Sequence, residues 1–185
     1  KNFNLLHSIV EYGASRGANS IELLKYKPSG RGRDSYESFA LDQQMLRQFY
    51  PLACSLQKRY SVELKIDCSF IPALAIHNPP LSDLEKLGVC GCDGGNMLLS
   101  IGSDGTFSGC SFVSNDEPSL QLGRLWRESG HLNAFRGLVE RAQPPCDSCP
   151  YCKICRCGCR AVALYYTGDF FAPDPECPRV FNYFN

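Results

Sequence analysis

The hydrophobic positions of the first 69 residues follow helical spacing in some segments and strand-like spacing in others. Apolar residues recur every three or four positions in two segments, which predicts amphipathic helices, and two further segments predict strands. Pro51 lies inside the second helix and is expected to kink or split it. Because helices alternate with strands here, we expect a parallel sheet. In chain order the four segments are residues 1–17, 20–26, 42–59 and 62–68.

The pattern changes in the second half of the chain. Asn78-Pro79-Pro80 interrupts it, and we place a domain boundary between residues 1–87 and residues 88–185. Beyond the boundary, two short strand-like runs flank Gly102-Ser103-Asp104-Gly105, which is typical of a hairpin turn. The expected fold class is therefore α+β. The elements predicted in this half are strands at residues 97–101 and 106–111 and helices at residues 132–141 and 160–166.

Charge and hydropathy exclude several function classes. Nineteen Lys and Arg residues balance nineteen Asp and Glu residues, so the net charge is zero and nothing indicates binding to nucleic acid. No apolar run approaches the roughly 18 residues that a membrane-spanning helix needs. We therefore expect no nucleic-acid or membrane partner, and we expect a cytoplasmic protein.

The cysteines carry the strongest signal in the sequence. The chain has 12 of them, and six fall between Cys146 and Cys159. A secreted disulfide scaffold would be shorter and would spread its cysteines evenly. Structural zinc sites often use two Cys-x2-Cys pairs. Only Cys146-x2-Cys149 is clearly arranged in that way, so the spacing favours iron–sulfur and leaves zinc open.

The number and spacing of the cysteines suit two clusters of four irons and four sulfides. Each such cluster takes four cysteine thiolates. In a Cys-x2-Cys pair two thiolates converge, and the backbone amides between them point at the sulfurs and favour the thiolate form. Antiparallel pairing of the predicted hairpin would bring Cys92 and Cys110 close together. The eight expected metal ligands are Cys90, Cys92, Cys110, Cys146, Cys149, Cys155, Cys159 and Cys177.

The spacing resembles the seven-cysteine signature of SPASM domains, which are C-terminal extensions of radical S-adenosylmethionine enzymes that modify peptides or proteins. The matching series is Cys92-x12-Gly105-x4-Cys110, then Cys146-x2-Cys149-x5-Cys155-x3-Cys159, then Cys177. Cys92-Asp93-Gly94 and Asp174-Pro175-Glu176-Cys177-Pro178 also resemble the first and last parts of that signature.

The resemblance implies two auxiliary four-iron clusters with interleaved ligands. The first would use Cys92, Cys110 and Cys159, with Cys90 as the fourth ligand. It also implies a peptide or protein substrate and an electron donor such as a flavodoxin or a ferredoxin. Cys152 and Cys157 match no signature position and are expected to be unligated or to act as substitutes for a ligand. The second cluster would use Cys146, Cys149, Cys155 and Cys177.

The front segment resembles the last α/β units of the partial TIM-type barrel of the same enzymes. The Cys-x3-Cys-x2-Cys loop that binds the radical-generating cluster is absent, and Cys54 and Cys68 lie too far apart to supply it. S-adenosylmethionine and a third four-iron cluster are therefore expected only in a longer parent enzyme. This chain alone is expected to be inactive, and no catalytic residue is assigned.

Two alternatives remain open at this point. The first is a zinc-binding interaction module without catalysis, which would be colourless and would contain zinc. The second is a stand-alone iron–sulfur module for electron transfer or peptide binding, which requires a natural gene that begins near Lys1.

Overall fold

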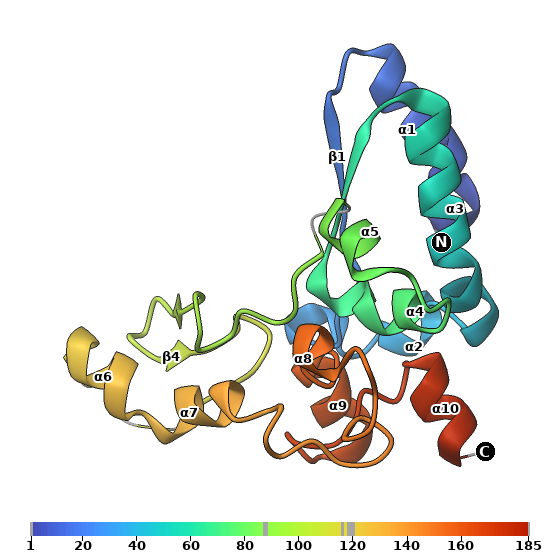
Figure 1. Ribbon diagram of the computed structural model, residues 1–185. Coiled ribbons are helices and arrows are strands. Elements are labelled where there is room, and N and C mark those ends of the chain that lie inside the picture. Colours follow the sequence, from blue (N-terminus) through green and yellow to red (C-terminus); the bar gives the residue numbers. More distant parts are fainter. Residues whose placement is uncertain (1, 87–88, 116, 118–120, 185) are drawn as a thin grey trace.

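The computed structural model describes residues 2–86, 89–115, 117 and 121–184 (Figure 1). The predicted domain boundary at residues 87–88 lies outside the described residues. The elements in chain order are η1 (Phe3–Leu5), α1 (Leu6–Ser15), β1 (Ser20–Leu23), η2 (Gly30–Gly32), α2 (Tyr36–Phe39), α3 (Gln43–Tyr60), β2 (Glu63–Ile66), η3 (Cys68–Phe70), α4 (Ile71–Ala75), α5 (Leu81–Lys86), β3 (Ser100–Ile101), β4 (Phe107–Ser108), α6 (Leu122–Glu128), α7 (Gly130–Arg136), α8 (Cys152–Cys155), α9 (Arg160–Thr167) and α10 (Pro178–Phe184).

The first half forms a strand–helix–strand unit. β1 and β2 pair in parallel, with Ser20 opposite Glu63, and α3 connects them, which confirms the predicted parallel pair. Leu64 and Ile66 of β2 point into the core and alternate with exposed residues. Figure 1 shows α1 and α3 packed side by side next to the two strands. A hydrophobic core between the helices and the strands therefore holds this unit together.

The helix α3 continues through Pro51, so the expected split does not occur. Proline has no N–H and leaves the carbonyl of the residue four positions earlier, Arg47, without its helical partner. His77 Nε2 lies 2.7 Å from this carbonyl oxygen and supplies the missing hydrogen bond. A residue that follows α4 thus replaces the bond that Pro51 removes. Asp42 caps the helix by accepting a hydrogen bond from the Met45 N–H over 2.7 Å.

The second half contains the predicted hairpin and several short helices. β3 and β4 pair antiparallel, with Ser100 opposite Ser108, over fewer residues than the sequence pattern predicts. The helix predicted at residues 132–141 is α7, which begins at Gly130 and ends at Arg136. Figure 1 shows the hairpin, α6 and α7 extending to the left of the remaining elements. Helices with two small two-stranded sheets are compatible with the expected α+β class.

Both halves of the chain contribute to one core. Tyr151, from the cysteine-rich loop, is buried among apolar side chains of the first half. Its hydroxyl donates a hydrogen bond to the Pro79 carbonyl over 2.9 Å. The helix α10, which the sequence pattern did not predict, contacts α3 and α4. None of the helices described here is long and apolar enough to span a membrane.

Candidate metal centres

The loop of residues 146–159 has an unusual backbone. Arg156, Cys157 and Gly158 have positive φ angles of 53°, 61° and 82°. Because two of the three carry side chains, the left-handed conformation costs about 1–2 kcal/mol at each of them. The N–H of Arg156 donates to the Cys152 carbonyl over 2.7 Å and helps to hold the turn. This turn reverses the chain between α8 and α9 and faces the cysteines of the loop toward one another.

A small cavity gathers five of the six cysteines of this loop together with Cys177, which precedes α10. Its volume is about 20 Å³, and Pro72 and Ala75 of α4 close one side. Four of its cysteines are the predicted second set of ligands, and Cys152 and Cys157 line it as well. The structure therefore brings the second set together but does not separate it from the two cysteines outside the signature. The six cysteines of the cavity are Cys146, Cys149, Cys152, Cys155, Cys157 and Cys177.

Crowding and burial keep most of these thiols protonated. A hydrogen bond from Cys146 to Cys157, together with burial, raises the pKa of Cys146. The same hydrogen bond lowers the pKa of Cys157 to about 7. Burial raises the pKa of Cys155 far above its ordinary value, and nearby Cys177 adds to the effect. A set of thiols that raise one another's pKa needs a positively charged centre before all of them can ionise together.

A second group of cysteines lies beside the buried thiol of Cys159. Cys92 and Cys110, from the two sides of the hairpin, pack against the hydrophobic cluster that contains Cys159. Burial raises the pKa of the Cys110 thiol, and nearby Cys92 raises it further. Burial also raises the pKa of Cys159, to about 11. The hairpin thus brings Cys92 and Cys110 together as predicted, and both lie near the start of α9.

Backbone amides point at sulfurs in both groups of cysteines. We call the six cysteines that line the cavity the cavity group, and Cys92, Cys110 and Cys159 the hairpin group. In the hairpin group, burial raises the pKa of Cys92 and Cys159. Hydrogen bonds from the N–H of Gly94 to Cys92 and from the N–H of Val162 to Cys159 lower the pKa and partly offset this effect. In the cavity group, the N–H of Val180 does the same for Cys177, whose pKa is about 11. Amide hydrogen bonds to cysteine sulfur are a means by which proteins set the potential of iron–sulfur clusters. The donor set therefore fits the cofactor that the sequence predicts.

The cysteine spacing suggests Cys90 as a ligand and gives Cys68 no place in either set, and the structure differs at both residues. Cys90 is exposed, and its Sγ lies 3.9 Å from an Asp93 carboxylate oxygen. Cys68 is half-buried at the start of η3, where burial raises the pKa of its thiol and the nearby groups of Asp67, Cys92 and Cys159 raise it further. Sequence analysis missed this position because Cys68 is the last residue of a predicted strand and lies far from the signature.

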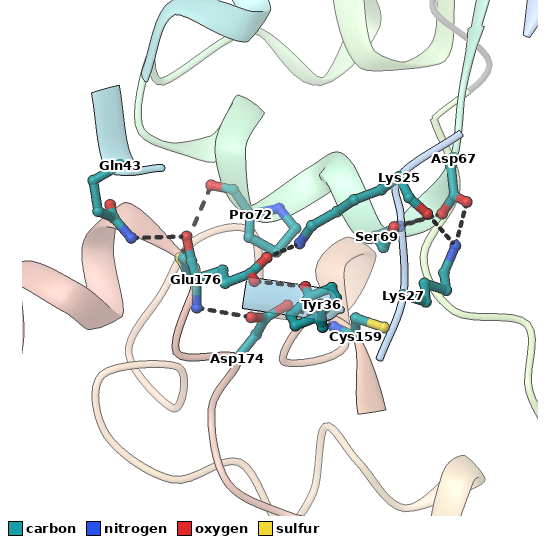
Figure 2. A network of polar contacts seen from close by, with 11 residues as sticks. Lys25, Lys27, Tyr36, Gln43, Asp67, Ser69, Pro72, Cys159, Asp174 and Glu176 are labelled. Atoms are coloured by element: carbon teal, nitrogen blue, oxygen red, sulfur yellow. Dashed lines mark hydrogen bonds and ion pairs between the residues drawn. The ribbon is translucent and has the colours of Figure 1, made fainter. Parts of the chain in front are cut away.

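Charged residues of the first half lie near Cys159 (Figure 2). Lys27 Nζ lies 2.5 Å from an Asp67 carboxylate oxygen, and both side chains are about nine-tenths buried. Lys25 Nζ lies 2.5 Å from Glu176 Oε2, an ion pair rather than a well-aligned hydrogen bond. The Tyr36 hydroxyl donates to the other oxygen of Glu176 over 2.6 Å. The two contacts with Glu176 fix the segment after β1 against the turn that carries Cys177.

Arg160 is 1% exposed and follows Cys159 directly. Its guanidinium donates hydrogen bonds to the carbonyls of Phe170 and Ala172, over 2.6 and 2.8 Å, and to the Cys157 carbonyl. These acceptors are neutral. Arg160 also opposes the burial that raises the pKa of Cys92. A buried cation beside cysteines suits a neighbouring group of net negative charge, such as a cluster held by four thiolates.

Among the residues that the structure describes, no three His, Cys, Asp or Glu side chains converge closely enough to hold a single metal ion. A zinc ion with four sulfurs at about 2.3 Å requires those sulfurs to lie within about 4 Å of one another. A cluster of four irons and four sulfides is larger, so its ligands stand farther apart. All twelve cysteines are free thiols in this structure.

Comparison with known proteins gives relatives but no matching family model. The chain is 28% identical to the mycofactocin maturase MftC of Mycolicibacterium smegmatis over 185 residues, which cover 96% of the chain and 44% of that protein. It is 31% identical to the mycofactocin maturase MftC of Mycobacterium tuberculosis over 175 residues, 89% of the chain and 41% of that protein. A 92-residue match to the PqqA peptide cyclase of Ruegeria pomeroyi is 36% identical and covers 46% of the chain and 24% of that protein.

The chain spans less than half the length of these relatives. The matches to the maturases nevertheless extend over 96% and 89% of the chain. From these relatives and the cysteine spacing we conclude that the chain belongs to the family of SPASM-containing radical S-adenosylmethionine proteins.

Proposed function

We propose that the chain is the C-terminal part of a radical S-adenosylmethionine enzyme that modifies a peptide or protein. The names of the relatives, two mycofactocin maturases and a peptide cyclase, support this class of substrate. S-adenosylmethionine, a third cluster and an electron donor such as a flavodoxin or a ferredoxin belong to the complete enzyme in this proposal. The parallel pair β1 and β2 with the crossover helix α3 supports assigning residues 1–87 to the last units of a partial barrel.

Within that enzyme, residues 88–185 form a SPASM domain that binds two auxiliary four-iron clusters. Cys92, Cys110 and Cys159 hold the first cluster, for which the sequence also suggests Cys90. The observation that carries this proposal is the cavity that gathers distant cysteines at the signature spacing. The second cluster takes the four signature cysteines of that cavity, Cys146, Cys149, Cys155 and Cys177.

When bound, such clusters accept and donate single electrons. The residues of this chain set the conditions for that chemistry. The N–H groups of Gly94, Val162 and Val180 stabilise the thiolates, and buried Arg160 offsets their negative charge. Apolar side chains around the cavity, such as Tyr151 and Val180, exclude water. The domain thus suits electron transfer to or from a substrate peptide, or the positioning of that peptide.

One variant from each group tests the proposal. The double variants Cys92→Ala/Cys110→Ala and Cys146→Ala/Cys149→Ala are each expected to remove about half of the iron from anaerobically reconstituted protein, because each removes two of the four ligands of one cluster. The two variants should lose different components of the Mössbauer spectrum. Cys54→Ala is the control, because Cys54 lies near Tyr50 and outside both groups. Two variants with unchanged iron content, or a wild-type protein that binds zinc in place of iron, would contradict the proposal.

A further inference from the structure

The proposed first cluster has three ligands that the structure brings together and a fourth that is less clear. Cys92 and Cys110 lie beside buried Cys159. Cys90 is separated from Cys92 by Gly91 alone, yet it is exposed, and the charged groups that act on its thiol are Asp93 and Arg156. Glycine is required between them, because a Cβ at residue 91 would lie 2.0 Å from the Ile154 carbonyl oxygen. Because Gly91 packs this closely against Ile154, the backbone has little freedom to turn Cys90 toward the other three cysteines.

Another cysteine faces the same group from the first half of the chain. Cys68 opens η3 directly after β2, so the end of a core strand fixes its backbone. The preceding residue, Asp67, caps η3 by accepting hydrogen bonds from the N–H and hydroxyl of Ser69, over 2.8 and 2.7 Å. Ser69 is buried. The position of Cys68 is therefore determined by a strand, a cap and a buried neighbour.

Lys27 lies between the segment that carries this cysteine and the segment that carries Cys110. The Lys27 ammonium is paired with Asp67 at 2.5 Å and lies 4.9 Å from the centre of the Phe112 ring, two residues after Cys110. The same ammonium acts on the thiols of Cys68, Cys110 and Cys159. Figure 2 shows the Cys159 sulfur on the side that faces Lys27 and Asp67.

The thiols also act on one another directly. Cys68 is within electrostatic range of Cys92 and Cys159, and Cys92 is within range of Cys110. Four cysteines thus lie near one another, at the end of β2, on both sides of the hairpin and at the start of α9. They are half-buried or buried, as ligands of a water-excluded cluster should be.

We infer that Cys68, rather than Cys90, is the fourth protein ligand of the cluster held by Cys92, Cys110 and Cys159. On binding, the Cys68 thiol loses its proton to solvent and forms a sulfur–iron bond. This inference rests on the proposed function. If Cys68 is a ligand, the first cluster also links the two halves of the chain, because a ligand at the end of β2 connects the cluster domain to the strand–helix–strand unit. The cysteine signature alone does not predict this link.

Three alanine variants of the full chain, reconstituted anaerobically with ⁵⁷Fe, test the inference. Cys68→Ala should give a cluster with one iron that lacks a protein ligand. That iron is lost on mild oxidation, which leaves a three-iron cluster in the Mössbauer and EPR spectra. Added 2-mercaptoethanol should bind the open iron and restore the four-iron spectrum. Cys90→Ala should match wild type, and so should the control Cys54→Ala, which changes another half-buried cysteine of the first half.

A second measurement uses the wild-type protein and does not depend on the folding of a variant. In the iron-loaded chain, iodoacetamide should label Cys90 rapidly and leave Cys68 unlabelled, and removal of iron with a chelator should make Cys68 reactive. The inference is overturned if Cys68 reacts equally fast with and without iron, or if Cys68→Ala keeps the wild-type spectrum. It is also overturned if Cys90→Ala shows the same loss of one iron on mild oxidation as Cys68→Ala. A wild-type protein that binds no iron would refute the proposed clusters themselves.

Discussion

The carboxylate of Asp174 accepts a hydrogen bond from the backbone N–H of Cys159 over 2.9 Å. Its other oxygen accepts one from the N–H of Glu176, also over 2.9 Å. Asp174 is 1% exposed. One buried side chain therefore holds both the start of α9 and the turn before Cys177 (Figure 2). In our proposal Cys159 and Cys177 bind different clusters, so Asp174 links the two sites.

Asp174→Ala should destabilise the protein and reduce the iron content of both sites. The change leaves two buried N–H groups without acceptors, at about 1–3 kcal/mol each. Chemical denaturation and iron determination measure the two effects. Asp104→Ala is the control, because Asp104 also accepts two hydrogen bonds, from the N–H and hydroxyl of Thr106, but lies in an exposed turn, and its loss should cost about 0.5 kcal/mol. Equal effects of the two substitutions would show that Asp174 has no special role.

The ion pair between Lys25 and Glu176 should show a large coupling energy. Removal of one partner from a buried pair leaves an uncompensated charge and costs about 3–5 kcal/mol. Lys25→Met should therefore be strongly destabilising, and the double variant with Glu176→Gln should recover part of the loss. The exposed pair of Arg124 and Glu128 provides the control cycle, with an expected coupling of about 0.3–0.5 kcal/mol. A coupling energy for Lys25 and Glu176 no larger than that of the control pair would contradict a stabilising ion pair between them.

Gly158 and Gly168 offer a matched test of the cysteine loop. Both have positive φ, 82° and 71°, so alanine strains the backbone at either position. At Gly168 a Cβ meets nothing within 4 Å, whereas at Gly158 it would lie 2.3 Å from Asp174 Cβ. We expect Gly168→Ala to cost about 1 kcal/mol and Gly158→Ala to prevent iron binding. Thermal unfolding and iron content of the two variants provide the comparison, and similar behaviour would refute the predicted clash.

His131 should make stability depend on pH. Burial lowers its pKa below the ordinary value of 6.5, and nearby Glu117 only partly opposes this. The unfolded chain then binds a proton more readily than the folded chain, so the free energy of unfolding falls as the pH drops below about 6.5. Unfolding curves at about pH 7.5 and about pH 5.5 measure this slope.

His131→Gln keeps a polar partner for the Ser108 hydroxyl, which lies 2.9 Å from His131 Nε2. This variant should lose less stability than wild type between the two pH values. An equal loss in the two proteins would assign the pH dependence to other groups.

The sequence was most informative where chemistry depends on local spacing. The periodicity predicted the parallel pair of β1 and β2, and the turn residues predicted the hairpin. The signature spacing predicted the four cysteines that line the cavity with Cys152 and Cys157. These features follow from contacts between residues that are near in sequence, or from a cysteine spacing that resembles the signature of the family.

The sequence was less informative where distant segments meet. Pro51 suggested a break in α3, but His77 hydrogen-bonds to the Arg47 carbonyl and the helix continues. Cys68 was grouped with the strand that precedes it, because nothing in its spacing connects it with Cys159. Tertiary packing decides both cases, and neither contact follows from the periodicity of a single segment.

Anaerobic determination of iron, acid-labile sulfide and zinc in the reconstituted wild-type chain tests the central claim most directly. Two four-iron clusters predict close to eight irons and eight sulfides per chain, with little zinc and a brown colour. A colourless protein that contains zinc, or a chain that retains almost no iron, would contradict the account.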